Sequence, residues 1–286
     1  SGGFAVISSA RQLKDLTRNL AIQKRADAQA LLRIYMLERL LERISVSRYQ
    51  QNFVLKGGML VASVVGVQAR STMDMDTVVK HLSVTVDNIR RVMTEVIEIE
   101  REDGVVFEIT QVSSMMEDAE YSGIRVKMEA LFDGMRIPLK VDITTGNPIV
   151  PEEILYYYKP LFGEGYINIY AYRIVTVLAE KAETILSRDV ANTRMRDFYD
   201  VYILLQLNRA DIRTEEFVDA LRQTMENRKT IHLLPQAERI LDDLNTSALM
   251  QSRWTAYQNK YEYAKSVDWV QVIEAVGMLL EQRVQC

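Results

Sequence analysis

Cysteine and histidine are nearly missing from the sequence. The one cysteine, Cys286, is the last of 286 residues, and the two histidines are His81 and His232. One cysteine cannot form an internal disulfide or a cysteine-based zinc site, and it is typical of a reducing compartment, so we expect a cytoplasmic protein. Two histidines make a serine–histidine triad or a histidine-rich metal site hard to build. Any metal chemistry is therefore expected from carboxylates, which bind hard ions such as magnesium or manganese.

Long hydrophobic runs are absent as well. No stretch of about 18 apolar residues occurs, so we expect neither a membrane-spanning segment nor a membrane partner. The hydrophobic content of 48% is ordinary for a globular protein, and the length allows one large domain or two modest ones.

Neither positive nor negative charge dominates the chain, but the charged residues are unevenly distributed. The net charge is -4, yet residues 1–56 carry ten Lys or Arg against four acidic residues. Residues 92–133 carry eleven acidic residues against three basic ones. This asymmetry permits a local surface for an anionic partner, although charged helix faces are more often simply solvated.

Hydrophobic periodicity divides the first part of the chain into helices and strands. Apolar residues at spacings of three and four predict a helical arm over residues 9–50 and a further helix over 84–100. A short strand is expected at 52–56, followed by a short helix that ends near Gly66.

The strongest sheet signal lies at residues 105–143. Two alternating segments flank Asp133-Gly134, a dipeptide favoured in tight hairpin turns. In the second segment Lys140 and Asp142 share the polar face, and Pro138 indicates an edge strand or a bulge.

From about residue 170 to the end the pattern predicts helices. We therefore expect an α+β protein with a mixed sheet flanked by helices. Its N-terminal domain would span residues 1–160, including the helical arm, and a helical C-terminal domain would span residues 161–286.

The stretch "ARSTMDMDTVV" brings two carboxylates close together. Asp74 and Asp76 would point to one face of a strand and Met73 and Met75 to the core, because side chains alternate with period two. Neighbouring carboxylates repel unless a proton or a cation relieves them. With Asp142 from another strand, three carboxylates could hold two divalent ions about 3.5–4 Å apart, as in phosphoryl transfer. Taken alone, the Asp pair would be solvated surface.

Two glycines upstream complete a candidate site. Gly57 and Gly58 close a strand and open a helix, where backbone N–H groups and a helix N-terminus can approach a phosphate. A Gly-Gly turn is usually structural. The order of strand, Gly-Gly, helix, Asp-x-Asp and a later Asp nevertheless predicts a nucleoside triphosphate site.

With these residues in this order, the sequence resembles the AbiEii-type nucleotidyltransferase toxins, a branch of the polymerase-β-like nucleotidyltransferase superfamily. Four segments between about residues 50 and 205 resemble the motifs of this family, in the family's order. The matching positions are Gly57, Gly58, Arg70, Ser71, Asp74 and Asp76 in the first motif, Lys140 and Asp142 in the second, Lys181 and Arg188 in the third, and Arg196, Asp197 and Asp200 in the fourth. The family often has leucine where this chain has Met75.

The resemblance implies a nucleotidyltransferase-type fold and a toxin of a type IV toxin–antitoxin system that acts in abortive phage infection. It implies a magnesium- or manganese-dependent enzyme that moves a nucleotide from a nucleoside triphosphate, such as GTP or a pyrimidine triphosphate, to an RNA acceptor. The acceptor expected from the family is the 3′ end of tRNA, which would block translation. The cognate antitoxin would be a separate protein that need not form a stable complex with the toxin.

The resemblance also assigns roles to the matching positions. Asp74, Asp76 and Asp142 would bind the metal ions and, with Lys181 and Asp197, form the catalytic set. The remaining matching positions, Gly57, Gly58, Arg70, Ser71, Arg188, Arg196 and Asp200, would contact the nucleotide. Asp197 and Asp200 could instead order the neighbouring arginines or belong to an ion-pair network.

Other interpretations stay open on the sequence alone. The protein could be a nucleotide-binding module that transfers nothing, or a transferase that modifies a protein. The basic N-terminal arm and Arg188, Arg194 and Arg196 could face tRNA. The "YYYK" stretch at 156–159 could stack on single-stranded nucleic acid, although successive tyrosines face different directions, so one or two at most could take part.

Overall fold

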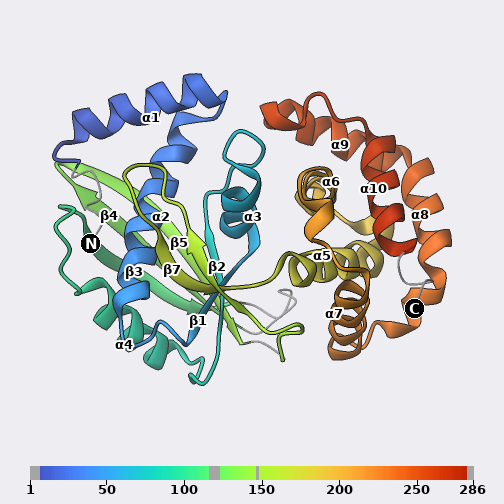
Figure 1. Ribbon diagram of the computed structural model, residues 1–286, viewed down its shortest axis with the longest axis horizontal. Helices are drawn as coiled ribbons and strands as arrows, with labels where there is room; N and C mark the ends of the chain where they lie inside the picture. The colour runs from blue at the N-terminus through green and yellow to red at the C-terminus, as the bar shows by residue number, and fades with distance from the viewer. Residues whose placement is uncertain (1–6, 116–122, 146–147, 282–286) are drawn as a thin grey trace. The chain divides into compact units, whose positions relative to one another are not determined.

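The computed structural model describes residues 7–115, 123–145 and 148–281, so Cys286 lies outside the described residues. It divides the chain into two compact units (Figure 1). The first unit comprises Ser1–Gly146 and Glu153–Ala171, and the second comprises Asn147–Glu152 and Tyr172–Cys286. The seven-stranded sheet lies in the first unit, and the second is helical.

The N-terminal arm is helical, as the sequence predicts, but it is two helices: α1 (Ala10–Lys24) and α2 (Ala28–Val46). The chain leaves α1 at Arg25, which has a left-handed φ of 51°. It enters α2 at Asp27, whose side chain accepts a hydrogen bond from the Ala30 amide at 2.6 Å. These are ordinary helix-ending and helix-starting devices. Most of α2 is buried, so it is a core helix of the unit.

The sheet has the strand order β3-β4-β5-β2-β1-β7-β6 and is mixed. The pairs β1–β7 and β2–β5 are parallel, and the others are antiparallel. The strands are β1 (Phe53–Lys56), β2 (Met75–Val79), β3 (Val106–Ser114), β4 (Gly123–Phe132), β5 (Met135–Thr145), β6 (Ile154–Tyr158) and β7 (Ile167–Ala171). Strands β6 and β7 were not predicted from the sequence.

Strands β4 and β5 form the predicted hairpin. Phe132 pairs with Met135, and both turn residues have positive φ, 43° at Asp133 and 79° at Gly134. This backbone is the one that two-residue hairpins favour. Pro138 does not lie on an edge strand, because β5 runs between β4 and β2. However, β5 pairs with β2 only from Val141 onward, so the part of β5 that holds Pro138 pairs with β4 alone.

One face of the sheet is packed against helices of its own unit. Helix α2 contacts β5 and β7, α3 (Gly57–Val65) contacts β1 and β2, and α4 (Val86–Ile97) contacts β3 and β4. Met75, Val141 and Ile143 lie on this face and are fully buried. The pleat therefore turns the alternate residues of β2 and β5, Asp76 and Asp142, to the opposite face.

The second unit is built from six longer helices joined by short turns, within the described residues. They are α5 (Ile174–Arg188), α6 (Met195–Asn208), α7 (Thr214–Asn227), α8 (Ala237–Thr246), α9 (Ala248–Lys260) and α10 (Trp269–Glu281). Phe198 packs on Trp269 with ring centroids 5.1 Å apart, and Phe198 and Tyr199 are core residues. Helix α9 lies in the stretch predicted to be helical, although no separate helix was predicted at its position.

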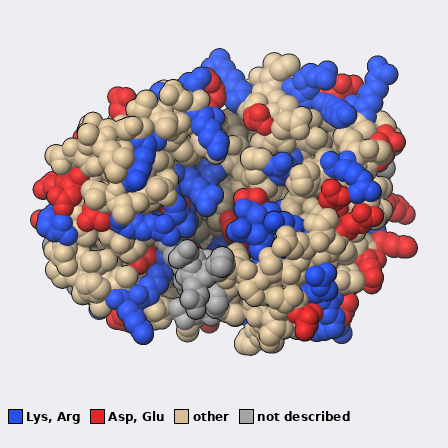
Figure 2. All heavy atoms as spheres, turned by 180° about the vertical axis from the view of Figure 1, so that it is seen from behind, with Lys and Arg blue, Asp and Glu red and all other residues tan. Residues whose placement is uncertain are grey.

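Both units carry charges of both signs on their surfaces. Figure 2 shows Lys and Arg side chains interspersed with Asp and Glu on the face it displays. Among the described helices, none is long and apolar enough to cross a membrane.

Candidate active site

Asp76 and Asp142 lie directly opposite each other on neighbouring strands. They are register partners in the parallel pair of β2 and β5. Adjacent strands are about 4.8 Å apart, so the two carboxylates project side by side from one face of the sheet. The sequence placed these two aspartates on separate strands, and the sheet brings the two strands together.

Asp142 and Asp74 each have a basic partner at short distance. The guanidinium of Arg125, on β4, donates two hydrogen bonds of 2.8 Å to the two carboxylate oxygens of Asp142. The ammonium of Lys140 lies 2.7 Å from the carboxylate of Asp74. The hydrogen bond to Asp142 raises the pKa of Arg125 above its ordinary value. These cations offset the repulsion among carboxylates on this face.

Asp74 lies in a bend just before β2, not inside the strand. The alternation of side chains between the two sheet faces therefore does not extend to the residues before Met75. The predicted placement of Met73 in the core is wrong. The Met73 side chain is 48% exposed, whereas Met75, the first residue of β2, is fully buried. Asp74 still reaches Lys140 of β5, so it belongs to the same group of charges as Asp142.

Gly57 and Gly58 form the junction between β1 and α3, as predicted. Gly57 has φ +65°, and a Cβ at this position would overlap with the Asp76 carboxylate. A Cβ on Gly58 would lie 2.7 Å from the hydroxyl oxygen of Thr72. The absence of side chains here thus lets the carboxylate and the 70–72 loop approach the N-terminus of α3, whose N–H groups suit a phosphate.

Arg70 and Ser71 lie in the loop that covers these glycines. Arg70 is buried, and its guanidinium donates a hydrogen bond to the Ser71 carbonyl. The hydroxyl of Thr72 donates to the Asp74 carbonyl at 3.2 Å. The loop is therefore held by its own polar side chains, and Ser71 is half-buried.

The carboxylates suit a divalent metal chemically, but they are turned towards basic side chains. Within the described residues, no three acidic, histidine or cysteine side chains are grouped closely enough to hold a metal ion. Asp142 faces Arg125 and Asp74 faces Lys140. Asp74, Asp76 and Asp142 supply the carboxylate donors that magnesium or manganese prefers. Metal binding would require Asp74 and Asp142 to exchange these basic partners for the ion.

The third and fourth motifs meet inside the second unit. The ammonium of Lys181, on α5, lies 2.9 Å from Asp197 and 2.8 Å from Asp200 of α6. Arg194 reaches the second oxygen of Asp197 at 2.6 Å. Both aspartates are fully buried, and the Lys181 side chain is only 11% exposed. The four side chains form an ion-pair network with both aspartates buried and Arg194 34% exposed.

The pKa values of this network show how strongly its charges are paired. Burial disfavours the charged form of Asp197, but Lys181 and Arg194 outweigh it and hold the pKa of that carboxyl well below its ordinary value. Burial likewise disfavours the Lys181 cation, and the two aspartates still raise its pKa. Asp197 and Lys181 are therefore both charged at neutral pH.

The two other arginines of these motifs lie on the same two helices. Arg188 is half-buried at the end of α5, and Arg196 is exposed on α6. Of the two arginines within reach of Asp197 on the sequence, Arg194 is the one that pairs with it.

Arg125 and Thr72 were not predicted as site residues from the sequence. The signal for Arg125 was available, because a two-residue turn at Asp133-Gly134 fixes the hairpin register. Counting back from that turn sets Arg125 opposite Asp142. Thr72 carries no comparable signal, since its role depends on how the loop folds over Gly58.

Comparison with known proteins gives one family match. The family model described as "Nucleotidyl transferase AbiEii toxin, Type IV TA system" matches residues 39–275. Comparison with curated protein sequences gives no match.

Solved structures with a similar arrangement include JHP933 from Helicobacter pylori, with 13% identity, a TM-score of 0.49 and coverage of 91% of this chain and 95% of that chain. An antigenic nucleotidyltransferase-like protein from Paracoccidioides brasiliensis shows 12% identity, a TM-score of 0.36 and coverage of 87% and 94%.

Proposed function

The chain belongs to the AbiEii family of nucleotidyltransferase toxins from type IV toxin–antitoxin systems, and from this premise we propose that it transfers a nucleotide from a nucleoside triphosphate to the 3′ end of tRNA. Such a modification would block translation, which accounts for toxicity and for a role in abortive phage infection. The family implies a nucleoside triphosphate substrate and a cognate antitoxin. We propose GTP or a pyrimidine triphosphate as the donor, and an antitoxin that acts without a stable complex.

The observation that supports this proposal is the pairing of Asp76 with Asp142 beside the glycines that open α3. Carboxylates next to a helix N-terminus can serve a triphosphate and its metal ions at once. A binding module would need the helix N-terminus, but it would have no use for the second carboxylate.

In the proposed reaction, the 3′-hydroxyl of the RNA attacks the α-phosphorus of the triphosphate. A new ester bond forms, the bond from the α-phosphorus to the bridging oxygen breaks, and pyrophosphate leaves. The hydroxyl proton passes to the Asp142 carboxylate, which can accept it once Arg125 has moved. Backbone N–H groups at Gly57 and Gly58, with Arg70 and Ser71, would bind the phosphates.

Magnesium, or manganese, would be held by Asp74, Asp76 and Asp142, and it would neutralise charge that develops on the transferred phosphate. Lys181 and Arg188 are proposed to counter the charge of pyrophosphate, with Asp197, Asp200 and Arg196 in supporting positions. These roles in the second unit rest on the order of the motifs.

The test incubates the purified protein with magnesium, total cellular RNA and each α-labelled triphosphate in turn. We expect label at the 3′ end of tRNA from one triphosphate, and none with the Asp76→Asn variant. Asp87→Asn, which changes an exposed aspartate on α4, is the matched control and should label RNA like the unchanged protein. Label on protein would favour a protein acceptor. Binding of triphosphate without any label would favour a module that transfers nothing.

A further inference from the structure

Two tyrosine rings project into solvent from the hairpin of β6 and β7. Tyr157 is 58% exposed and Tyr166 is 59% exposed. Their ring centroids are 6.2 Å apart and their planes meet at 78°, edge to face. In this arrangement the rings do not cover each other as a parallel stack would, so aromatic surface stays open to a ligand.

The neighbouring tyrosines hold this segment in place from the other side of the sheet. The hydroxyl of Tyr156 lies 3.0 Å from the hydroxyl of Ser63 on α3. The hydroxyl of Tyr158 donates to Glu38 of α2 at 3.1 Å, and Tyr158 is buried. Because both flanking residues are anchored, Tyr157 has to point to the opposite face, and β6 presents it on a fixed backbone.

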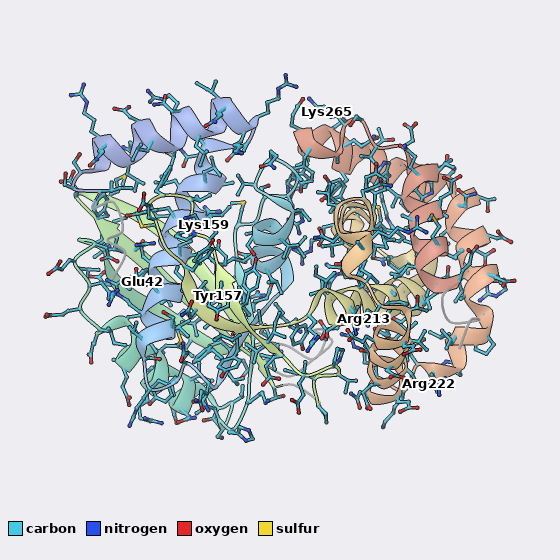
Figure 3. The ribbon with its side chains drawn as sticks, viewed as in Figure 1. Glu42, Tyr157, Lys159, Arg213, Arg222 and Lys265 are labelled. Atoms are coloured by element: carbon cyan, nitrogen blue, oxygen red, sulfur yellow. The ribbon has the colours of Figure 1, made fainter. Side chains whose placement is uncertain are left out.

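A positive charge accompanies the two rings. The ammonium of Lys159 lies 5.3 Å from the centre of the Tyr166 ring, within the range of a cation–π contact. It also donates to the carbonyls of Gly163 and Gly165, at 3.5 and 3.4 Å. Figure 3 shows Tyr157 and Lys159 on the same part of the first unit. We call Tyr157, Lys159 and Tyr166 the tyrosine platform.

The strand register assigns the platform to the sheet face that carries the catalytic carboxylates. Tyr157 pairs with Asn168, and two residues further on Leu155 pairs with Tyr170, which pairs with Val54 of β1. Two residues beyond Val54, Lys56 pairs with Asp76. Steps of two along a strand and direct pairs between strands keep to one face.

The distance along this face between the tyrosine platform and Asp76 suits a short single strand of nucleic acid. From β6 to β2 there are three strand spacings, roughly 15 Å, and the offset along the strands is about four residues, or roughly 13 Å. Exposed side chains of Leu155 and Asn168 lie between the platform and the end of the hairpin nearest Gly57. A chain of a few nucleotides extended along this line would place its end near Asp76.

We propose that the tyrosine platform binds unpaired bases of the RNA acceptor by stacking, upstream of the end that receives the nucleotide. This inference rests on the proposed function, in which the acceptor is RNA. Open aromatic faces with an adjacent ammonium fit a nucleic-acid single strand, since bases stack on tyrosine and phosphates attract lysine. A protein partner that extended the sheet at β6 would instead use the backbone of the edge strand.

The experiment measures binding of a short, fluorescein-labelled single-stranded RNA by anisotropy, without triphosphate or metal. We expect Tyr157→Ala with Tyr166→Ala to raise the Kd at least tenfold, the order of effect of losing base–tyrosine stacking. Tyr157→Phe with Tyr166→Phe keeps the rings and should stay within about twofold. The duplex of the same RNA should bind the unchanged protein more weakly, because its bases are already stacked.

The remaining outcomes separate this inference from the proposed function. Equal RNA affinity in the alanine and phenylalanine variants would overturn the platform, even if the unchanged protein labels tRNA. A loss of affinity in the phenylalanine variant as large as in the alanine variant would also overturn it, because stacking does not need the hydroxyl. Labelling of protein instead of RNA would overturn the proposed function first, and the platform with it. Affinity for triphosphate should be the same in all variants.

Discussion

The carboxylate of Asp76 fills the space that a side chain at position 57 would need. Gly57 has φ +65°, and the Asp76 carboxylate lies against its Cα from the neighbouring strand. The junction of β1 and α3 and the candidate metal ligand are therefore fitted to each other. A substitution at either residue should therefore displace the other.

Gly57→Ala tests this fit. The variant would be strained by its positive φ and would push Asp76 aside, so we expect a loss of about 1–3 kcal/mol in the free energy of unfolding and loss of nucleotide transfer. Urea denaturation and the labelling assay measure the two effects. Gly134→Ala is the control, because Gly134 has φ +79° with no atom within 4 Å of its Cβ position. It should lose some stability and keep transfer. Equal transfer in both variants would contradict the proposed coupling.

Arg125→Gln tests the exchange of partners at Asp142. Arg125 must leave Asp142 before a metal ion can use both oxygens, so its removal should tighten binding of Mn2+ in the absence of nucleotide. We expect about a fivefold lower Kd by electron paramagnetic resonance, which corresponds to about 1 kcal/mol for a partly exposed ion pair. Lys127→Gln, an exposed change two residues along the same strand, should leave the Kd unaltered. Weaker Mn2+ binding in Arg125→Gln would mean that the arginine instead orients Asp142 for the metal.

Glu38 predicts a dependence of stability on pH. Burial raises the pKa of its carboxyl from 4.5 to about 8, although Arg39 and the hydrogen bonds from Leu161 and Tyr158 oppose the rise. Between these values the folded protein binds a proton that the unfolded chain has released. The contribution of Glu38 to the free energy of unfolding is therefore fully present below pH 4.5. It falls as the pH rises to 8, by at most about 1.4 kcal/mol per pH unit.

The Glu38→Gln variant isolates this contribution. Glutamine cannot ionise, so its free energy of unfolding should exceed that of the unchanged protein at pH 8 and approach it near pH 5. Urea denaturation at several pH values measures the difference. A difference that does not change with pH would show that Glu38 is ionised in the folded protein throughout.

Lys181→Met tests the buried network of the second unit. The substitution would leave Asp197 and Asp200 fully buried with their main counter-charge removed, and we expect a loss of about 3–5 kcal/mol in the free energy of unfolding. Lys260→Met, at the exposed end of α9, should change it by less than about 0.5 kcal/mol. If Lys181→Met keeps full stability and loses only transfer, the lysine serves the reaction and is not needed for folding.

The local sequence determined the elements whose signals are contained in a few neighbouring residues. Short-range steric and hydrophobic patterns account for the Asp133-Gly134 turn, the alternation of β5, the glycines between β1 and α3, and the helices of the second unit other than α9. The predicted nucleotide site used the same signals, and its residues Asp76 and Asp142 do lie together. The break at Arg25 was missed because no glycine or proline marks it in the sequence.

Only the tertiary structure decided how distant segments pair. The parallel pairs β2–β5 and β1–β7 join strands that are far apart in sequence, and no local periodicity encodes them. The same holds for the burial of Lys181 between two aspartates, because charged residues on a helix look solvated until their partners are known. Which tyrosine of "YYYK" faces solvent was settled by the anchoring of Tyr156 and Tyr158 on other elements. The local sequence thus gives the chemistry of each side chain, whereas the exposure and the partners of that side chain depend on which elements pack against each other.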